Sequence, residues 1–478
     1  MTGTTRLAPR YQGHRIRDGH PALPGNRGSV DPLFLERRAS EHPGPSEMNL
    51  LVTNTRTGQA YCVMRSLRKH ARKVVATIYG ENRFVARLAP VAVSRFVDRI
   101  YHVPAAVDDW RRGNIRQENT ATEEDYIRAI VEICDKERID TIFPSWDPKV
   151  YLFSKNKKRF VDRGITIPVP EWDVLQKVMD KFRLMGVASE MGFPCPRSFL
   201  PRNPQEAMEF AEILGFPLII KPRFSSGARG TYLVRDRGEL AEKIQQVERT
   251  YGMPMLQEWI PGGKGQLINV AVTLDRGHQV KTVYCRRILR TVFNSFSSVS
   301  SAEISCDEPH LAAQAVQLLQ RLGYHGHARF EIQVDPRDGL GKLMEINCRP
   351  GFRVWCEIEA GQDIPLLCLK IERGEPAEAV NGGNRADVFL NPIEDAMSLV
   401  VFLVNLMSQK ILRTAPHEAL GRVPGFRETL REYRQTYGAE RRFFDWYFRA
   451  LTNDPFAALA WYATHLTFIM RGPKNLFH

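Results

Sequence analysis

The sequence lacks several patterns that would assign it to a common class. No run of 18 or more apolar residues occurs among its 478 residues, so no transmembrane helix is predicted. None of its eight cysteines forms a CxxC pair, which argues against a zinc site and favours reduced thiols in the cytoplasm. There is no GxGxxG turn, and the stretch GGKGQ has no Ser or Thr after its lysine. Two common nucleotide-binding loops, the dinucleotide fingerprint and the Walker A loop, are therefore absent.

The charge balance is basic, but no long block of Lys or Arg occurs. The formal net charge is +13, which suits anionic partners such as nucleotides, nucleic acid or an acidic membrane surface. Because the basic residues are scattered, a solvated basic surface is favoured over nucleic-acid binding, and no nucleic-acid partner is expected. The length predicts two to four domains.

The first 47 residues differ from the rest of the chain. They are rich in Arg, Pro and Gly, lack apolar periodicity, and contain no apolar core of a secretory signal. We expect residues 1–47 to form a disordered leader, native or not, because they contain too few apolar residues to offset the entropy of ordering. An Arg-rich transit peptide is the less favoured alternative.

Strands and helices alternate from Met48 onward. Apolar runs at 49–55, 73–79 and 140–146 predict strands, and residues 59–70 and 123–139 have helical spacing. Such alternation predicts a doubly wound parallel sheet over residues 48–170.

A small-residue loop follows a buried strand in FPLIIKPRFSSGARGTYLV. Its glycines permit close approach to a ligand, and backbone N–H groups in such a loop bind phosphate oxygens. Lys221 ends the strand and would add a positive charge. The candidate ligand-binding residues are Lys221, Ser225, Ser226, Gly227 and Gly230. A hairpin with a flexible tip and a solvated lysine explains this stretch equally well.

The stretch MLQEWIPGG is an extended segment that stops at a turn. Its backbone groups can bind the edge of an adenine ring, and the residues concerned are Gln257, Glu258, Trp259 and Ile260. On this stretch alone, an ordinary edge strand is the favoured interpretation.

Polar residues interrupt the apolar strands of HARFEIQVDPRDGLGKLMEINCR. An Asp338-Gly339 turn predicts a hairpin. Glu331 and Glu345 lie equally far from Asp338 along the chain, so folding the hairpin places them opposite each other on the two strands. Asn347 shares a face with Glu345 because side chains alternate along a strand. Paired like charges are destabilising without a cation, and Mg²⁺ takes one or two carboxylates together with substrate phosphates. These three residues are candidate magnesium ligands; a solvent-exposed sheet face is the alternative.

Together these motifs resemble the ATP-grasp superfamily over about residues 48–380. The order Lys221, Ser/Gly loop, QEWIPGG, Glu331 and MEIN followed by Arg349 is most similar to stand-alone carboxylate–amine ligases related to the carbamoyl-phosphate-synthase ATP-binding domain. The resemblance implies a doubly wound pre-ATP-grasp domain (48–170) and a two-lobed ATP-grasp domain (171–380). Its small lobe would cover about 180–260 and its large lobe about 261–380, before a helical C-terminal region (381–478).

The resemblance also implies a reaction and residue roles. A carboxylate would attack the γ-phosphate of ATP to give an acyl phosphate and ADP, and an amine would then displace phosphate. Lys181 and Lys221 would contact the phosphates, Glu258 and Ile260 would hold adenine, and the hairpin residues would bind Mg²⁺. Arg329 would stabilise charge during acyl transfer, and Arg349 would lie near the acceptor. The sequence departs from the usual family motif at two positions. Gln266 stands where an acidic residue usually binds the ribose hydroxyls. Cys348 replaces a proline, and we interpret this as a change in packing.

Three questions stay open at this stage. Arg286, Arg287 and Arg290 would bind a substrate anion or lie on a solvated strand face. Apolar helices at 394–412 and 454–472 would pack, form a homodimer or, less favoured, contact a membrane peripherally. The alternative functions are an ATP-grasp phosphotransferase and a noncatalytic nucleotide sensor; nothing indicates a biotinyl domain.

Overall fold

The computed structural model describes residues 48–53, 58–79, 92–106, 119–263, 265–291, 300–380, 386–412 and 426–470. Side chains are not described at 401, 404–412, 447 and 464–470. The expected leader, residues 1–47, lies outside the described residues.

The N-terminal part is a parallel α/β domain. Its four-stranded sheet has the order β3 (Arg99–His102), β2 (Ala71–Ile78), β1 (Met48–Thr53) and β4 (Thr141–Pro144), and these strands pair in parallel. The covering elements are α1 (Gly58–Leu67), η1 (Arg68–His70), α3 (Ala121–Glu137), α4 (Asp147–Lys155) and α5 (Lys157–Val161). Strand β1 is buried along its whole length because both of its faces are covered. The doubly wound domain predicted from the sequence is confirmed.

The small lobe follows two connecting helices, α6 (Trp172–Met179) and α7 (Lys181–Glu190). Its antiparallel sheet has the order β5 (Ser198–Phe199), β8 (Met255–Glu258), β6 (Leu218–Lys221) and β7 (Tyr232–Val234). Helices α8 (Pro204–Leu214) and α9 (Arg237–Tyr251) bury an apolar cluster against this sheet. Strand β6 ends at Lys221, so the Ser/Gly loop begins at the lobe's edge.

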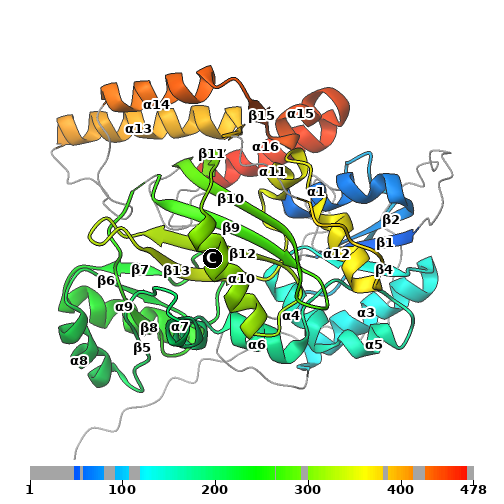
Figure 1. Ribbon diagram of the computed structural model, residues 1–478, viewed down its shortest axis with the longest axis horizontal. Coiled ribbons are helices and arrows are strands. Elements are labelled where there is room, and N and C mark those ends of the chain that lie inside the picture. The colour runs from blue at the N-terminus through cyan, green and yellow to red at the C-terminus, as the bar shows by residue number, and fades with distance from the viewer. Residues whose placement is uncertain are drawn as a thin grey trace, which may run out of the picture.

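The large lobe is built on a seven-stranded sheet. Its order is β13 (Gly341–Asn347), β12 (Gly326–Val334), β9 (Leu267–Leu274), β10 (Val280–Thr291), β11 (Ser300–Ser305), β14 (Val388–Leu390) and β15 (Arg442–Phe444). Helix α10 (Pro309–Arg321) packs on one face, in a cluster that includes Val270, Phe330 and Leu343. Helices α11 (Val354–Glu359) and α12 (Ile364–Arg373) belong to a second cluster with Ala271 and Tyr284, on the other face (Figure 1). The polar residues of the hairpin share that second face.

In its described residues, the C-terminal region contains four helices and also two strands. Helices α13 (Pro392–Leu412) and α14 (Phe426–Gly438) lie side by side, and α15 (Trp446–Asn453) and α16 (Pro455–Met470) follow (Figure 1). The expected helical region is confirmed, and β14 and β15, three residues each, are additional elements that extend the large sheet. Such short strands leave too little periodicity to be read from sequence.

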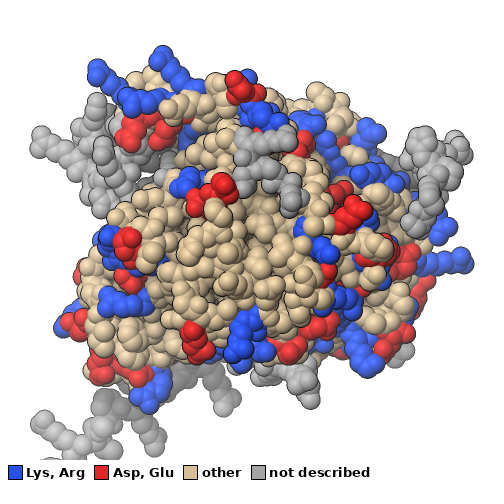
Figure 2. All heavy atoms as spheres, viewed as in Figure 1, with Lys and Arg blue, Asp and Glu red and all other residues tan. Residues whose placement is uncertain are grey.

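Helix α16 packs into the protein through its aromatic residues. Trp461 and Tyr462 are buried, and Trp461 stacks on Phe352 with 5.4 Å between ring centroids. Packing within the protein, rather than membrane contact, therefore accounts for these two aromatic residues of α16. Within the described part of the chain, no helix is long and apolar enough to cross a membrane. Acidic and basic side chains are interspersed on the face seen in Figure 2, in keeping with the scattered charge of the sequence.

Candidate functional site

The β12–β13 hairpin places Glu331 directly opposite Glu345, and Arg329 opposite Asn347. Electrostatic contacts in the turn stabilise this register. The buried Asp335 carboxylate forms an ion pair with Lys342 at 2.8 Å and accepts a hydrogen bond from the Arg337 backbone N–H at 3.0 Å. The expectation that Glu331 and Glu345 face one another across the strands is confirmed.

The two carboxylates are only partly compensated by their neighbours. Asn347 Nδ2 donates to Glu331 Oε1 and to Glu345 Oε1, each at 3.2 Å, and Arg329 lies 3.3 Å from Glu331. The side chains of Glu331 and Glu345 are 30% and 29% exposed, so a ligand can reach both. Burial, and then the neighbouring Glu345 carboxylate, raise the pKa of Glu331 to about 7. The pair therefore favours an additional cation.

Two buried lysines approach the hairpin from the small lobe and from α7. Lys181 Nζ donates to the Ser225 carbonyl at 2.8 Å and lies 3.6 Å from Glu345. Lys221 Nζ contacts the Met344 carbonyl at 3.5 Å. Burial, and then the Lys181 charge, lower the pKa of Lys221 to about 8. The two ammonium groups thus lie on one side of the carboxylate pair, where polyphosphate oxygens would neutralise them.

The Ser/Gly loop begins beside these lysines. Gly227 and Gly230 have φ of +62° and +72°, which non-glycine residues rarely adopt. A Cβ on Gly230 would lie 2.7 Å from Pro222, so this position also requires the absence of a side chain. Ser226 Oγ is buried and has no hydrogen-bond partner within the described parts of the chain. The loop therefore has the backbone freedom that the predicted phosphate contact requires.

The segment after β8 is the candidate adenine contact. The edge-strand interpretation is wrong, because β8 pairs with both β5 and β6. Gln257 is buried and donates to Ser198 Oγ at 2.8 Å, while the Glu258 carboxylate accepts from Arg337 at 2.7 Å. Because both side chains already have hydrogen-bond partners, we expect backbone groups near Trp259 and Ile260 to bind the adenine edge. This role stays a prediction.

Asp147 is a site residue that the sequence reasoning missed. It holds the Arg349 guanidinium in two hydrogen bonds of 2.7 and 2.5 Å. It also lines a pocket whose other members are Val150, Leu175, Val178, Met179, Lys181, Ser225, Glu345, Ile346, Asn347 and Cys348. Asp147 directly follows the β4 region, at the carboxyl edge of the parallel sheet, where ligands bind in open α/β folds. The position of Asp147 just after a predicted strand is therefore the feature of the sequence that could have identified it as a site residue.

Other candidates have structural partners. Arg286 pairs with Glu303, and Arg290 binds Asp395 through two hydrogen bonds of 2.8 Å; both arginines are buried. Neither the substrate-anion nor the solvated-face interpretation describes these two residues. Arg287 is partly exposed and pairs with Glu308 at 2.5 Å.

Cys348 is a packing residue rather than a reactive thiol. Burial raises its pKa to about 12, which suppresses the thiolate. Gln266 Oε1 accepts from the Gly263 N–H at 2.8 Å, and its proposed contact with ribose stays a prediction.

The donor set fits a hard cation that keeps other oxygen ligands. Among the described residues, no group of three or more His, Cys, Asp or Glu side chains is arranged to hold a metal. Glu331, Glu345 and Asn347 instead supply two carboxylates and one amide, and turning the amide would present its oxygen. This set suits Mg²⁺ completed by phosphate oxygens and water.

Comparisons with known proteins identify the central part of the chain. Residues 180–379 match the family model of the carbamoyl-phosphate synthase L chain ATP-binding domain, and residues 117–168 match the PylC-like N-terminal domain. A D-aspartate ligase of Enterococcus faecium is 24% identical over 231 residues, 45% of this chain and 55% of that protein. The carbamoyl phosphate synthase large chain of Pyrococcus furiosus is 28% identical over 119 residues, 24% of this chain and 11% of that protein. The match thus spans little more than half of the length of the D-aspartate ligase, and about a tenth of the length of the carbamoyl phosphate synthase large chain.

Solved structures share the fold. Biotin carboxylase from Campylobacter jejuni aligns with a TM-score of 0.55 and 18% identity, covering 69% of this chain and 72% of that one. The biotin carboxylase domain of Hydrogenobacter thermophilus 2-oxoglutarate carboxylase, a dimer in complex with MgADP, aligns with a TM-score of 0.56 and 19% identity, covering 72% and 74%. At this identity the likeness concerns the fold alone.

Proposed function

We propose that the chain is an ATP-dependent carboxylate–amine ligase, because residues 180–379 match the family model of the carbamoyl-phosphate synthase L chain ATP-binding domain. It would activate a small-molecule carboxylate as an acyl phosphate, with release of ADP, and an amine would then displace phosphate to form an amide bond. The D-aspartate ligase relative supports this reaction class, although the match covers only 55% of that protein.

The observation that carries the proposal is the facing pair of carboxylates beside two buried lysines. Glu331, Glu345 and Asn347 would hold Mg²⁺, which when bound neutralises charge on the transferring phosphoryl group. Lys181 and Lys221 would orient the phosphates, because both ammonium groups lie on the side of the hairpin from which the Ser/Gly loop begins.

The remaining roles follow the position of each side chain. Ser225, Ser226, Gly227 and Gly230 would cover the phosphates, and the segment Gln257–Ile260 would hold adenine. Arg329, which contacts Glu331, would stabilise negative charge during acyl transfer. Arg349, held by Asp147 at the pocket wall, would lie near the acceptor.

The products of ATP consumption test this proposal. The full chain with MgATP is offered a panel of carboxylic acids that includes D-aspartate, with hydroxylamine as the trapping amine. ADP, phosphate and a hydroxamate are expected with the correct acid, and Glu345→Gln should form none. AMP and pyrophosphate would overturn the acyl-phosphate mechanism. A stable phosphorylated product would favour a phosphotransferase, and ATP binding without turnover of any acid would favour a nucleotide sensor.

We also propose that the protein acts in the cytoplasm. All eight cysteines lie in described residues and each is a free thiol, as expected for a reducing compartment. Homodimer formation through the C-terminal helices stays a prediction, and size-exclusion chromatography with light scattering would test it.

A further inference from the structure

The turn after β13, Arg349–Arg353, contacts both the N-terminal domain and the C-terminal region. Arg349 reaches the N-terminal domain through Asp147. Phe352 stacks on Trp461 of α16. Arg353 binds the C-terminal region through Glu394 at 2.8 Å and Asp445 at 3.2 Å. A short turn beside the candidate metal ligands is therefore held by both flanking domains.

Gly351, in the middle of this turn, makes room for a site residue. A Cβ at this position would lie 2.2 Å from Arg329 Nη1 and 2.7 Å from Arg329 Cζ. Gly351 is not among the glycines with positive φ, so space rather than backbone conformation explains the glycine. The Arg329 guanidinium therefore lies directly against the backbone of the turn.

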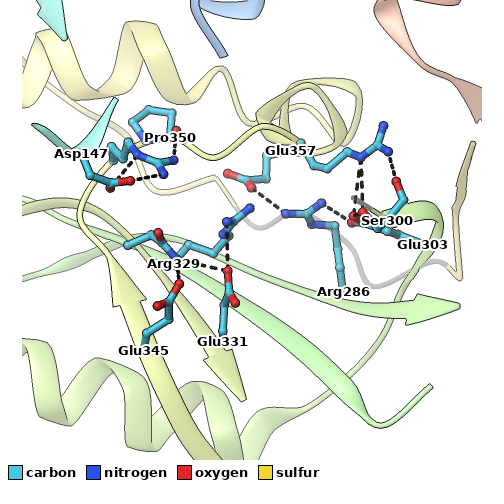
Figure 3. Close-up of polar contacts among 12 residues, drawn as sticks. Asp147, Arg286, Ser300, Glu303, Arg329, Glu331, Glu345, Pro350 and Glu357 are labelled. Carbon is cyan, nitrogen blue, oxygen red and sulfur yellow. Dashed lines mark hydrogen bonds and ion pairs between the residues drawn. The ribbon is translucent and has the colours of Figure 1, made fainter. Parts of the chain in front are cut away.

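A row of buried charges lies between Arg329 and Arg353, at the end of the turn. The guanidinium of Arg329 lies between the carboxylates of Glu331 and Glu357 in Figure 3. Arg286 bridges Glu357, at 3.4 Å, and Glu303.

Glu303 in turn lies 3.7 Å from Arg353, the last residue of the turn. The four side chains of this row are at most 5% exposed: Arg286, Glu303, Arg353 and Glu357. A row of buried charges thus runs from the neighbourhood of Arg329 to Arg353, which is anchored on Glu394 and Asp445.

We propose that the Arg349–Arg353 turn positions Arg329, that Gly351 is the surface on which its guanidinium rests, and that the C-terminal region takes part by holding Arg353. Gly351, Arg353 and Asp445 are positioning residues in this scheme, since none of them needs to touch a substrate. The inference rests on the proposed function only in giving Arg329 a role in the reaction.

The first test is Gly351→Ala, with Gly341→Ala as its matched control. Both changes add one methyl group to the same hairpin segment, but a Cβ at Gly341 meets a methyl group of Leu311 at 2.7 Å. Gly351→Ala should lower kcat by about 10- to 100-fold, the scale of a displacement of about 1 Å. The affinity for ATP should stay within about twofold of wild type, since the phosphate-binding residues are unchanged. Equal kcat values for the two variants would overturn the proposal.

A double-mutant cycle shows whether residue 351 acts through Arg329. In an Arg329→Lys background, the smaller ammonium does not lie where the new methyl group would be. Gly351→Ala should then change kcat by no more than about twofold. A merely structural role predicts the same fold-loss in both backgrounds, and that result would contradict the proposal.

The C-terminal arm is tested by Asp445→Asn against Glu359→Gln. Glu359 on α11 also contacts the C-terminal region, through Trp446 at 2.5 Å and Arg449, but among the described residues it forms no ion pair with Arg353. Asp445→Asn should lower kcat by about three- to tenfold at unchanged ATP affinity, and this loss should be non-additive with Gly351→Ala. Glu359→Gln should affect only the melting temperature. A fall in melting temperature without loss of kcat in Asp445→Asn would remove the C-terminal region from the scheme.

These measurements can use any ATP-consuming reaction that the chain performs. Hydroxamate formation is the assay where an acid is found, and slow hydrolysis of ATP by water serves otherwise. A phosphorylated product in place of a hydroxamate would refute the proposed ligase reaction but leave the positioning test intact. Additivity between Gly351→Ala and Arg329→Lys would refute the positioning of Arg329 whichever reaction is observed.

Discussion

Two regions of the same large sheet use charge in opposite ways. At the β12–β13 edge, Glu331 and Glu345 face each other with about 30% of each side chain exposed. On β10, the central strand of the sheet, Arg286 and Arg290 are buried, and each is matched by a carboxylate. Like charges that remain opposed and accessible indicate a place for a ligand. Opposite charges matched in the interior indicate scaffold, even where the residues first suggest a binding site.

The largest expected effect tests the ligand side of this comparison. Glu345→Gln should lower turnover by about 1,000-fold or more, because no neighbouring group replaces a lost metal ligand with the same geometry. The protein should stay folded, since the change removes one of two opposed charges. The matched control is Glu308→Gln, which changes a carboxylate paired with Arg287. Comparable losses of turnover in both variants, measured as ADP release, would contradict the distinction.

The second prediction tests the scaffold side through stability. Arg290→Met should reduce the free energy of unfolding by about 3–5 kcal/mol, because Asp395 would remain buried without its partner. Arg287→Met should cost less than about 1 kcal/mol, since Arg287 is partly exposed. Urea unfolding followed by circular dichroism measures both values. A similar, small cost for the two substitutions would mean that Arg290 is not a structural anchor.

The same contrast explains which features the sequence could predict. The opposition of Glu331 and Glu345 follows from strand periodicity and one turn between them, both of which are local. The partner of Arg290 is Asp395, 105 positions away, and the partner of Arg349 is Asp147, 202 positions away. Such pairs depend on how separate domains dock, and neither composition nor periodicity encodes docking. Strands β14 and β15 were missed for a different reason, since three residues each leave too little periodicity.

The third prediction concerns the nucleotide. Lys221→Ala should weaken ATP binding by about 1–3 kcal/mol, the cost of losing a charge-assisted contact. Lys243→Ala, on α9 of the same lobe, should leave affinity unchanged because its charge lies beside Glu242, away from the hairpin. Isothermal titration with a nonhydrolysable ATP analogue and Mg²⁺ provides the measurement. Unchanged affinity in Lys221→Ala would show that the phosphates bind elsewhere.

The smallest effect concerns how stability depends on pH. Burial, and then the Glu345 carboxylate, raise the pKa of Glu331 from its ordinary value of 4.5 to about 7. Between about pH 4.5 and 7 the folded protein therefore holds a proton on Glu331 that the unfolded chain has released, so this group makes stability fall as pH rises through that window. Glu345→Gln removes the second cause and should lower the pKa of Glu331, which reduces that fall by up to about 1 kcal/mol.

Urea unfolding without Mg²⁺ at pH 5 and pH 7.5 measures the difference, with Glu308→Gln as the control. Burial also raises the pKa of Glu357 to about 7, but its contribution should be nearly the same in all three proteins and largely cancel. Parallel stability curves for wild type and Glu345→Gln would mean that the two carboxylates do not interact, and the principal argument for a cation between them would fail.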